Sequence, residues 1–365
     1  HGVNQQVRVY RTVVDGIAVY LLDALHNDIF VEPYQEMWKE FCESVILSRA
    51  SLELIRILDL KPQIMHSNDH HAALVTLYMR TIYKDYFART GNVFTIHNIG
   101  YQGVYPLAWY PDIGVEGCGN VLVKHDQLNL LTSVPEVILQ YQQEGHYANT
   151  VSDTYAEEIR SMSLPFDADI LMNAVGRRFG GILNGIDYSV WNPATDAALT
   201  VHYCIDQGID EVKRAKAVNK KALVELLSAS DGVESLGISR EKQFGTFIPV
   251  EGRMLAGVVS RFVRQKQIDI VAQMIEDIYE SRKSDPGIDF IILGTAIPGS
   301  QDEWLEERIA DLARRYPYHR FVYVRAYSDI LARKIYAGAD VLLIPSDYEP
   351  SGLTQMIAIR YGTVP

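Results

Sequence analysis

A carboxylate at a predicted strand-to-helix turn is the first feature that could carry chemistry. The apolar residues 341–344 are bounded by Asp340 and Pro345 and predict a buried strand of a parallel sheet. The run after Pro350 predicts a helix whose first turn holds that proline. Glu349 stands between the two elements, where its carboxylate can accept hydrogen bonds from sugar hydroxyls.

The predicted helix start adds a second kind of binding group beside Glu349. The first N–H groups of a helix have no partner within it and favour anions such as phosphate. Here these groups belong to Gly352, Leu353 and Thr354. One turn could therefore hold both ends of a nucleotide sugar. The alternative is an ordinary helix with the usual acidic residue in its first turn, and Glu-Pro alone does not separate the two.

A basic pair follows the first predicted strand of the carboxyl-terminal half. Arg261 and Lys266 stand in the stretch 260–266, which leads into a predicted helix. Arginine offers a planar fork of donors and lysine a point charge, so the pair can neutralise a diphosphate. The alternative is a solvated basic helix start, but cations are disfavoured at helix N-termini. That conflict favours a functional role for the pair.

Histidines and an aspartate crowd the turn after the predicted strand 62–66. The order His66-x-x-Asp69-His70-His71 invites a metal interpretation, because both residue types ligate zinc. However, the spacing departs from the His-x-His-x-Asp-His pattern of metallohydrolases, and the sequence contains no second ligand cluster. We therefore expect no metal here and favour a histidine that contacts a sugar, with a buried structural histidine as the alternative.

Two further patterns could suggest a metal, but neither predicts one. Asp167-Ala-Asp169 is similar to the Asp-x-Asp clamp of manganese-dependent sugar transferases, yet it lacks matching context and is interpreted as a surface loop. Cys42, Cys118 and Cys204 are far apart and outside any Cys-x-x-Cys spacing. They indicate neither a zinc site nor a disulfide framework. They fit a reducing compartment, which favours the cytoplasm, or the plastid stroma for a plant or algal protein.

An alternation of strands and helices positions these groups. Strands are predicted over 16–22, 62–66, 92–97, 146–151, 181–187, 254–259, 290–293, 320–324 and 341–344. Helices are predicted over 34–58, 72–86, 268–279 and 301–315. This alternation predicts an α/β fold of two doubly wound Rossmann-like domains, with polar groups collected at the carboxyl ends of the strands.

The predicted domain boundary lies in the mixed segment 188–252, which contains Asn192-Pro193 and the polar run 228–237. We expect one Rossmann-like domain over 1–245 and a second over 246–365, facing each other across a cleft.

Composition and charge exclude several classes of protein. The 365 residues are 48% hydrophobic, which is ample for two cores. The formal net charge of −12 disfavours partners such as nucleic acid and anionic membranes. No apolar run approaches the roughly 18 residues that span a membrane. No Gly-x-Gly-x-x-Gly turn follows an early strand, which argues against a nucleotide-dependent oxidoreductase.

Six stretches together carry a resemblance to a known family. They are 66–74, 95–103, 150–156, 182–193, 260–266 and 335–365, and their order and spacing span nearly the whole chain. In these stretches the chain resembles the bacterial glycogen synthases and plant starch synthases, which use a nucleotide-diphosphoglucose donor and have the two-domain GT-B fold.

The resemblance implies a reaction as well as a fold. It implies retaining transfer of glucose from ADP-glucose or UDP-glucose to the non-reducing end of an α-1,4-glucan, with no metal or other cofactor. It assigns the acceptor and catalytic groups to residues 1–245 and the nucleotide sugar to residues 246–365. The motifs do not choose between the two donors, and they leave the oligomeric state open.

The resemblance also implies roles for individual residues. The catalytic residues would be His71, Arg261, Lys266 and Glu349, and substrate would be bound by Asn98, Gln102, Asn184, Tyr327, Gly352, Leu353 and Thr354. In this scheme His71 and Asn184 contact the donor glucose, while Arg261 and Lys266 hold the diphosphate as it leaves. Tyr327 stacks on the adenine.

Some residues depart from the family pattern. His70 stands in place of the usual Trp, Gln267 in place of a Gly and Ser351 in place of a Cys. Ile357 stands eight residues after Glu349, where many other retaining GT-B transferases have a second glutamate. Isoleucine in place of this glutamate favours a glycogen or starch synthase over sucrose-type or mannosyl relatives.

Two glycine loops that the family uses to hold diphosphate lie outside residues 1–365. We therefore expect these residues alone to be truncated at both ends of the family pattern and to retain at most weak donor binding. The alternative to an active synthase is a non-catalytic fragment or a glucan-binding relative of the family.

Overall fold

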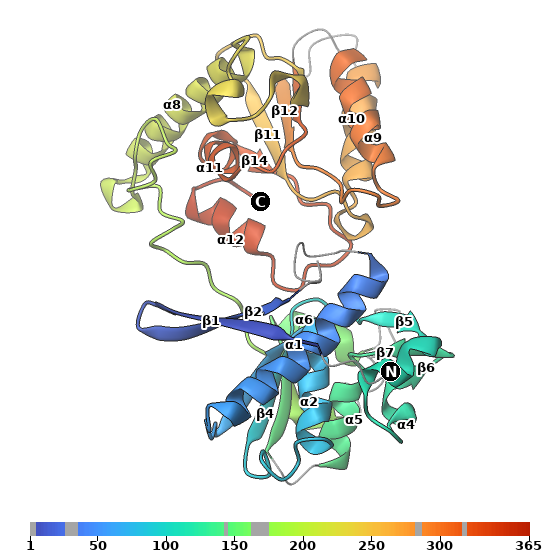
Figure 1. The fold of residues 1–365 in the computed structure, drawn as a ribbon. Helices are drawn as coiled ribbons and strands as arrows, with labels where there is room; N and C mark the ends of the chain where they lie inside the picture. Colours follow the sequence, from blue (N-terminus) through green and yellow to red (C-terminus); the bar gives the residue numbers. More distant parts are fainter. Residues whose placement is uncertain (1–4, 26–35, 142–144, 162–174, 282–286, 316–319) are drawn as a thin grey trace. The chain divides into compact units, whose positions relative to one another are not determined.

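The computed structural model describes residues 5–25, 36–141, 145–161, 175–281, 287–315 and 320–365. They fall into two compact units, His1–Asn184 and Gly185–Pro365 (Figure 1). The predicted Asp167 and Asp169 and the first residues of the predicted helix 34–58 lie outside the described residues.

The first unit is built on a four-stranded sheet in the order β3-β4-β8-β9, in which every pairing is parallel. These strands are β3 (Ile64–Asn68), β4 (Gly91–Ile96), β8 (His146–Thr150) and β9 (Phe179–Gly181). A small antiparallel sheet has the order β5-β7-β6, with β5 (Val104–Pro106), β6 (Val123–Lys124) and β7 (Gln127–Asn129). The parallel pairing places the carboxyl ends of β3, β4, β8 and β9 along one edge, as the sequence predicts.

Helices pack closely around the parallel sheet. They are α1 (Met37–Ile57), α2 (Ala73–Arg80), α3 (Tyr110–Ile113), α4 (Gly119–Leu122), α5 (Ser133–Gln140) and α6 (Asp153–Arg160), with short 3-10 turns η1 (His70–Ala72), η2 (Leu107–Trp109) and η3 (Gly176–Arg178). All eight residues of α2 are buried, because α1 and α5 both pack against it. A helix that is apolar on most faces belongs in a core, and it holds η1 in place at its amino end.

The predicted strand 16–22 does not join the parallel sheet. It is β2 (Ile17–Ala24), which pairs antiparallel with β1 (Val7–Val14) in a separate two-stranded sheet. The two strands are joined by Asp15 and Gly16, which have φ of 50° and 80°. Two successive positive φ values make a tight hairpin turn, for which Asp-Gly is a favoured sequence.

The second unit contains a five-stranded sheet in the order β10-β13-β12-β11-β14. The strands are β10 (Gln243–Gly245), β11 (Met254–Val259), β12 (Ile288–Leu293), β13 (Phe321–Val324) and β14 (Val341–Leu342). The helices are α8 (Ile209–Ser228), α9 (Ile268–Ser281), α10 (Trp304–Arg315), α11 (Asp329–Gly338) and α12 (Leu353–Arg360), with 3-10 turns η4 (Ile205–Gln207), η5 (Glu234–Leu236), η6 (Arg240–Lys242) and η7 (Arg264–Lys266). Only β10 is antiparallel to its neighbour.

Both faces of this sheet are buried, which explains why its strands are almost continuously apolar in sequence. Along β12, Ile291 and Leu293 pack on the side of α8, α11 and α12, whereas Phe290 and Ile292 pack on the side of α9 and α10. Figure 1 shows the two groups of helices on opposite sides of the sheet. The alternation has the period of two that a strand imposes.

The division between the units differs from the predicted boundary at 245/246. Residues 185–245 belong to the second unit, because α8 packs along α11 and β10 pairs with β13. Lys220 of α8 forms an ion pair with Asp340 at 2.7 Å, just before β14. The turn signals in the segment 188–252 therefore mark loops inside one unit.

Several predicted elements end earlier or begin later than expected. The helix predicted over 72–86 ends at Arg80, the strand over 181–187 ends at Gly181, and the strand over 341–344 ends at Leu342. The last helix begins at Leu353, so Pro350 does not lie in its first turn. The reason is Gly352, whose φ of 74° places the N-cap two residues after the proline.

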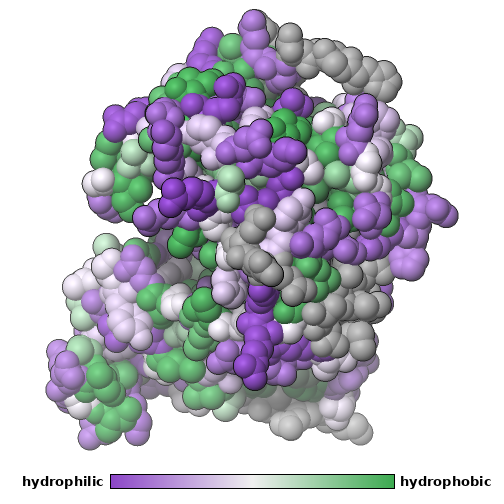
Figure 2. Space-filling model, turned by 90° about the horizontal axis from the view of Figure 1, so that it is seen from below, coloured by the Kyte–Doolittle hydropathy of each residue, from purple (hydrophilic) through white to green (hydrophobic). Residues whose placement is uncertain are grey.

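The surface mixes polar and apolar residues. On the face that Figure 2 shows, hydrophobic patches are interrupted by hydrophilic ones. Within the described ranges, no helix is both long enough and apolar enough to cross a bilayer.

Candidate active site

Two loops of the second unit lie at the point where its strand order reverses. From β11 the chain proceeds outward through β12 and β13, and then β14 returns to the other side of β11. The loops 260–267 and 343–352 follow the carboxyl ends of the paired strands β11 and β14. Open parallel sheets bind ligands at this kind of switch point, where adjacent loops diverge.

Hydrogen bonds join these two loops to each other. The backbone N–H of Asp347 donates to the carbonyl of Gln265 at 2.9 Å, and the Gln265 side chain donates to the carbonyl of Tyr348 at 2.8 Å. Two bonds in opposite directions fix the register between the loops. They hold the side chains that follow, Lys266 and Glu349, at a defined separation.

Lys266 and Glu349 form an ion pair at the centre of the site. The Nζ atom of Lys266 lies 2.5 Å from Oε1 of Glu349, and the hydroxyl of Ser346 donates to the same oxygen at 2.6 Å. The two charged side chains are 22% and 20% exposed. The pair is therefore shielded enough to act strongly on a bound charge and still accessible to a ligand. This contact brings together two residues that the sequence places 83 positions apart.

The start of α12 lies next to Glu349. Gly352 is the N-cap, and a Cβ atom at this position would lie 2.7 Å from Oε1 of Gln355. Glycine is favoured here by its φ of 74°, whereas the end of the flexible Gln355 side chain could move aside. Having no side chain, it cannot cap the first turn, so the N–H groups of Leu353 and Thr354 depend on another partner.

Two more predicted residues lie on other loops of the same sheet. Arg261 is exposed in the loop after β11. Tyr327 follows β13 and precedes the N-cap Ser328 of α11, whose hydroxyl accepts a hydrogen bond from the N–H of Leu331. Tyr327 is 89% exposed, which leaves its ring available for stacking.

In the first unit, the predicted polar residues follow the carboxyl ends of the parallel strands. His71 lies in η1 after β3, Asn98 after β4, and Asn184 after β9. Asp69 links the first two loops, because its N–H donates to the carbonyl of Thr95 and its carboxylate accepts from the N–H of His97. The φ of Asp69 is 56°, a left-handed conformation that aspartate tolerates better than most residues.

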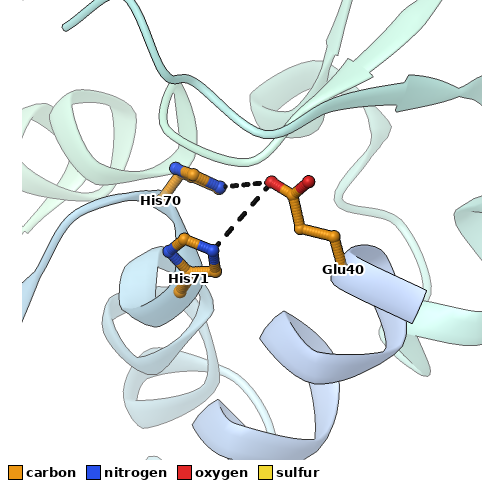
Figure 3. A group of neighbouring side chains, drawn as sticks. All are labelled: Glu40, His70 and His71. Carbon is orange, nitrogen blue, oxygen red and sulfur yellow. Dashed lines mark hydrogen bonds and ion pairs between the residues drawn. The ribbon is translucent and has the colours of Figure 1, made fainter. Parts of the chain in front are cut away.

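His71 belongs to a cluster whose third member, Glu40, could not be recognised from the sequence. Glu40 of α1 points toward His70 and His71 of η1 (Figure 3). Its Oε1 lies 2.8 Å from Nε2 of His70 and 3.9 Å from Nε2 of His71. Burial lowers the pKa of His71, and a positive charge on His70 lowers this pKa further. His71 is therefore neutral near pH 7 and can accept or donate one hydrogen bond.

Gln102 lies in a different environment from the other predicted residues. It is 6% exposed, and its side-chain oxygen accepts a hydrogen bond from Asn129 at 2.6 Å. Its backbone carbonyl also accepts from the N–H of Leu131. These contacts tie the loop after β4 to β7, so Gln102 supports the loop that carries Asn98.

The first comparison with known proteins concerns the amino-terminal half. Residues 1–174 match the family model described as the starch synthase catalytic domain. The chain is 35% identical over 335 residues to the glycogen synthase of Thermotoga maritima, a match that covers 88% of this chain and 59% of that protein.

A second relative extends the match over the whole chain. The glycogen synthase of Hydrogenobaculum sp. is 33% identical over 377 residues, with 100% of this chain and 68% of that protein covered. The chain belongs to the glycogen and starch synthase family. It spans about three fifths of the length of the Thermotoga maritima family member.

Solved structures agree with this family assignment. The catalytic domain of starch synthase IV from Arabidopsis thaliana, bound to ADP and acarbose, has a TM-score of 0.77 at 28% identity, and the match covers 99% of this chain and 68% of that one. An α,α-trehalose-phosphate synthase from Burkholderia vietnamiensis has a TM-score of 0.53 at 12% identity, covering 98% of this chain and 71% of that one. The predicted family and the GT-B class of α/β fold are thus confirmed.

Proposed function

We propose that this protein is a retaining glucosyltransferase that extends α-1,4-glucans from ADP-glucose or UDP-glucose. Membership of the glycogen and starch synthase family supports the reaction class. The observation that carries the proposal is the Lys266–Glu349 pair, held at the switch point of the second sheet beside an uncapped helix start. We place the reaction in the cytoplasm, or in the plastid stroma if the source is a plant or alga.

In this proposal the second unit binds the nucleotide sugar. Glu349 accepts hydrogen bonds from the glucose hydroxyls, while its contacts with Lys266 and Ser346 hold its carboxylate in one orientation. The N–H groups of Gly352, Leu353 and Thr354 face the phosphates at the start of α12. The exposed ring of Tyr327 stacks on the base.

Polar residues of the first unit are suited to bind sugar hydroxyls. His71 is neutral because burial lowers its pKa, so it can hydrogen-bond a hydroxyl without bringing a positive charge to the sugar. Asn98 and Asn184 follow β4 and β9 of the same parallel sheet, and their amides suit hydroxyl recognition. Gln102 acts indirectly, since it is buried and positions the loop of Asn98.

The chemical step breaks the bond between the glucose anomeric carbon and the phosphate oxygen. The glucan 4-hydroxyl attacks the oxocarbenium-like sugar from the face that the diphosphate leaves, and its proton passes to the departing diphosphate oxygen as the new bond forms. Negative charge develops on the departing diphosphate, and Arg261 and Lys266 lie on the loop that stabilises it. Stabilising charge as it develops is usually the largest catalytic contribution. Because two cationic side chains supply this charge, we propose that transfer requires no metal or other cofactor.

The test is to replace Lys266 in the protein expressed from its complete reading frame. Lys266→Gln should lower the kcat for glucose transfer from ADP-glucose into glycogen by about 100-fold to 1000-fold, the usual cost of losing one such group. Lys266→Arg keeps the charge and should recover part of the rate. Lys213→Gln, on the exposed side of α8, is the matched control and should leave kcat within about twofold.

Circular dichroism before each assay separates misfolding from lost chemistry. A folded Lys266→Gln protein with kcat within about threefold of the parent would contradict the proposal. A decrease in kcat for Lys213→Gln as large as that for Lys266→Gln would also contradict the proposal.

A further inference from the structure

In the first unit, three side chains of residue types that can ligate metals converge from two separate elements. Glu40 comes from α1, and His70 and His71 come from η1, so the cluster depends on how α1 packs against the turn after β3 (Figure 3). One ligand atom from each residue lies within 4.8 Å of the other two. No other residues within the described ranges meet this condition.

The separations within the cluster suit a single divalent ion. Bonds of about 2.0–2.1 Å in a tetrahedral zinc site place the ligand atoms about 3.3 Å apart. The Oε1 atom of Glu40 lies 2.8 Å from Nε2 of His70 and 3.9 Å from Nε2 of His71. These two distances bracket the required value, so small side-chain rotations would form the site.

The ligand types select among metals. Two imidazoles and one carboxylate are a set that zinc and its neighbours in the first transition series accept, whereas magnesium and calcium prefer oxygen ligands alone. Glu40 supplies the carboxylate of this set, and His70 and His71 supply the two imidazoles.

We propose that Glu40, His70 and His71 bind one divalent transition-metal ion of the zinc class, with an open position for water. An ion held in this way occupies the Nε2 lone pair of His71. It would therefore block the sugar contact of that residue and inhibit transfer, a consequence that rests on the proposed function. The site itself does not depend on that function.

The surroundings of His70 limit how tightly the ion is held. The Nε2 atom of His70 is hydrogen-bonded to Glu40 in this structure. To bind a metal, Nε2 must be unprotonated, so the ring proton must lie on Nδ1 instead. The Nδ1 atom is buried and has no hydrogen-bond partner in the described part of the chain. Missing support of this kind costs about tenfold to a hundredfold in metal affinity. We therefore expect micromolar binding of Zn²⁺.

The site depends on His70, a residue at which this sequence differs from the family pattern. His70 stands where the family resemblance leads to an expectation of Trp, which cannot ligate a metal. Relatives with Trp at this position should lack the site, so the Trp substitution is an informative variant.

The experiment measures metal binding directly. Tag-free, chelator-treated protein is titrated with ZnCl₂ by calorimetry and with CoCl₂ by visible absorption, which reports nitrogen and oxygen coordination. The parent protein should bind one ion with a micromolar Kd. Glu40→Gln, which keeps a hydrogen bond to His70, should weaken that site by more than about tenfold, as should His71→Gln and His70→Trp.

The matched control is Glu43→Gln, which changes the charge by the same amount one turn along α1. It should bind Zn²⁺ within about threefold of the parent. Equal binding by the parent and Glu40→Gln, or an equal loss in Glu43→Gln, would overturn the site. If all three ligand variants lose binding but Zn²⁺ leaves transfer by the parent enzyme unchanged, the site stands and the proposed blocking of His71 is wrong.

Discussion

Acid should destabilise the first unit through one buried histidine. His146 begins β8 and is fully buried, and its Nε2 accepts a hydrogen bond from Nε of Arg80 at 2.9 Å. The other two nitrogens of Arg80 donate to the carbonyls of Phe87 and Thr90, so the guanidinium is fixed in place. Protonation of His146 would therefore put two positive charges in contact inside the core. Burial and, to a smaller extent, the positive charges of Arg80 and Arg178 together lower the pKa of His146 to about 4.

The sign and size of the effect follow from this pKa. In the unfolded chain the pKa of histidine is about 6.5, so between pH 6.5 and pH 4 the unfolded state binds more protons than the folded state. The free energy of unfolding must then fall as the pH falls through this window. At pH 5 the loss attributable to His146 should be up to about 2 kcal/mol relative to pH 8.

The assay compares the parent with His146→Gln, whose amide oxygen can accept the same hydrogen bond but does not titrate. Hydrogen-exchange mass spectrometry of peptides from β8 during urea unfolding reports the first unit alone. The parent should lose more stability than His146→Gln between pH 8 and pH 5, by about 1–2 kcal/mol. His125→Gln, at an exposed histidine, is the control and should behave as the parent does. Equal losses in the parent and His146→Gln would refute the reasoning.

Two other substitutions test the second unit. Lys216→Met should lower the free energy of unfolding by about 3–5 kcal/mol, because its partly buried ammonium donates to the carbonyls of Ala337 and Tyr361 and to the hydroxyl of Thr363, and all three acceptors would lose this donor. Lys213→Met, exposed on the same helix, should change it by less than about 0.5 kcal/mol in the same urea titration. Gln267 has φ of 46°, so Gln267→Gly should be neutral or stabilising by up to about 1 kcal/mol. Gln267→Val should instead lower the free energy of unfolding by more than about 1 kcal/mol. A Gln267→Val protein more stable than the Gln267→Gly protein would show that the left-handed turn is not strained.

The positions of the core strands along the chain were the most predictable feature of the fold. Apolar runs such as 254–259 coincide with β11, because strands buried on both faces need no polar residues. Polar residues after those runs, including Lys266 and Glu349, do gather where paired parallel strands end. Local sequence suffices here because parallel pairing brings successive strand ends to one edge.

Features that depend on tertiary packing could not be predicted in the same way. Glu40 lies 30 residues before His70, and the helical spacing of α1 does not specify which of its residues meets η1. Gln102 is polar and follows a strand, yet its bond to Asn129 buries it. The unit boundary was misplaced because α8 carries an apolar face whose partner, α11, stands about a hundred residues later.

The start of α12 was misplaced for a local reason. Proline favours the first turn of a helix, which made Pro350 a plausible first residue. Gly352 instead adopts a positive φ and delays the helix to Leu353. A glycine two residues after a proline is the signal that favours this later start.

We propose that the protein transfers glucose with retention from a nucleotide diphosphate sugar without a metal. The most direct measurement supplies ADP-glucose or UDP-glucose, labelled in the glucose, and glycogen to the protein from its complete reading frame, with a strong chelator present. We expect the label to enter glycogen from at least one donor at the same rate as without the chelator, and to be released by an exo-glucosidase specific for α-1,4 bonds. Transfer that stops with the chelator and returns only with Mg²⁺ or Mn²⁺, or label that forms no α-1,4 bond, would contradict it.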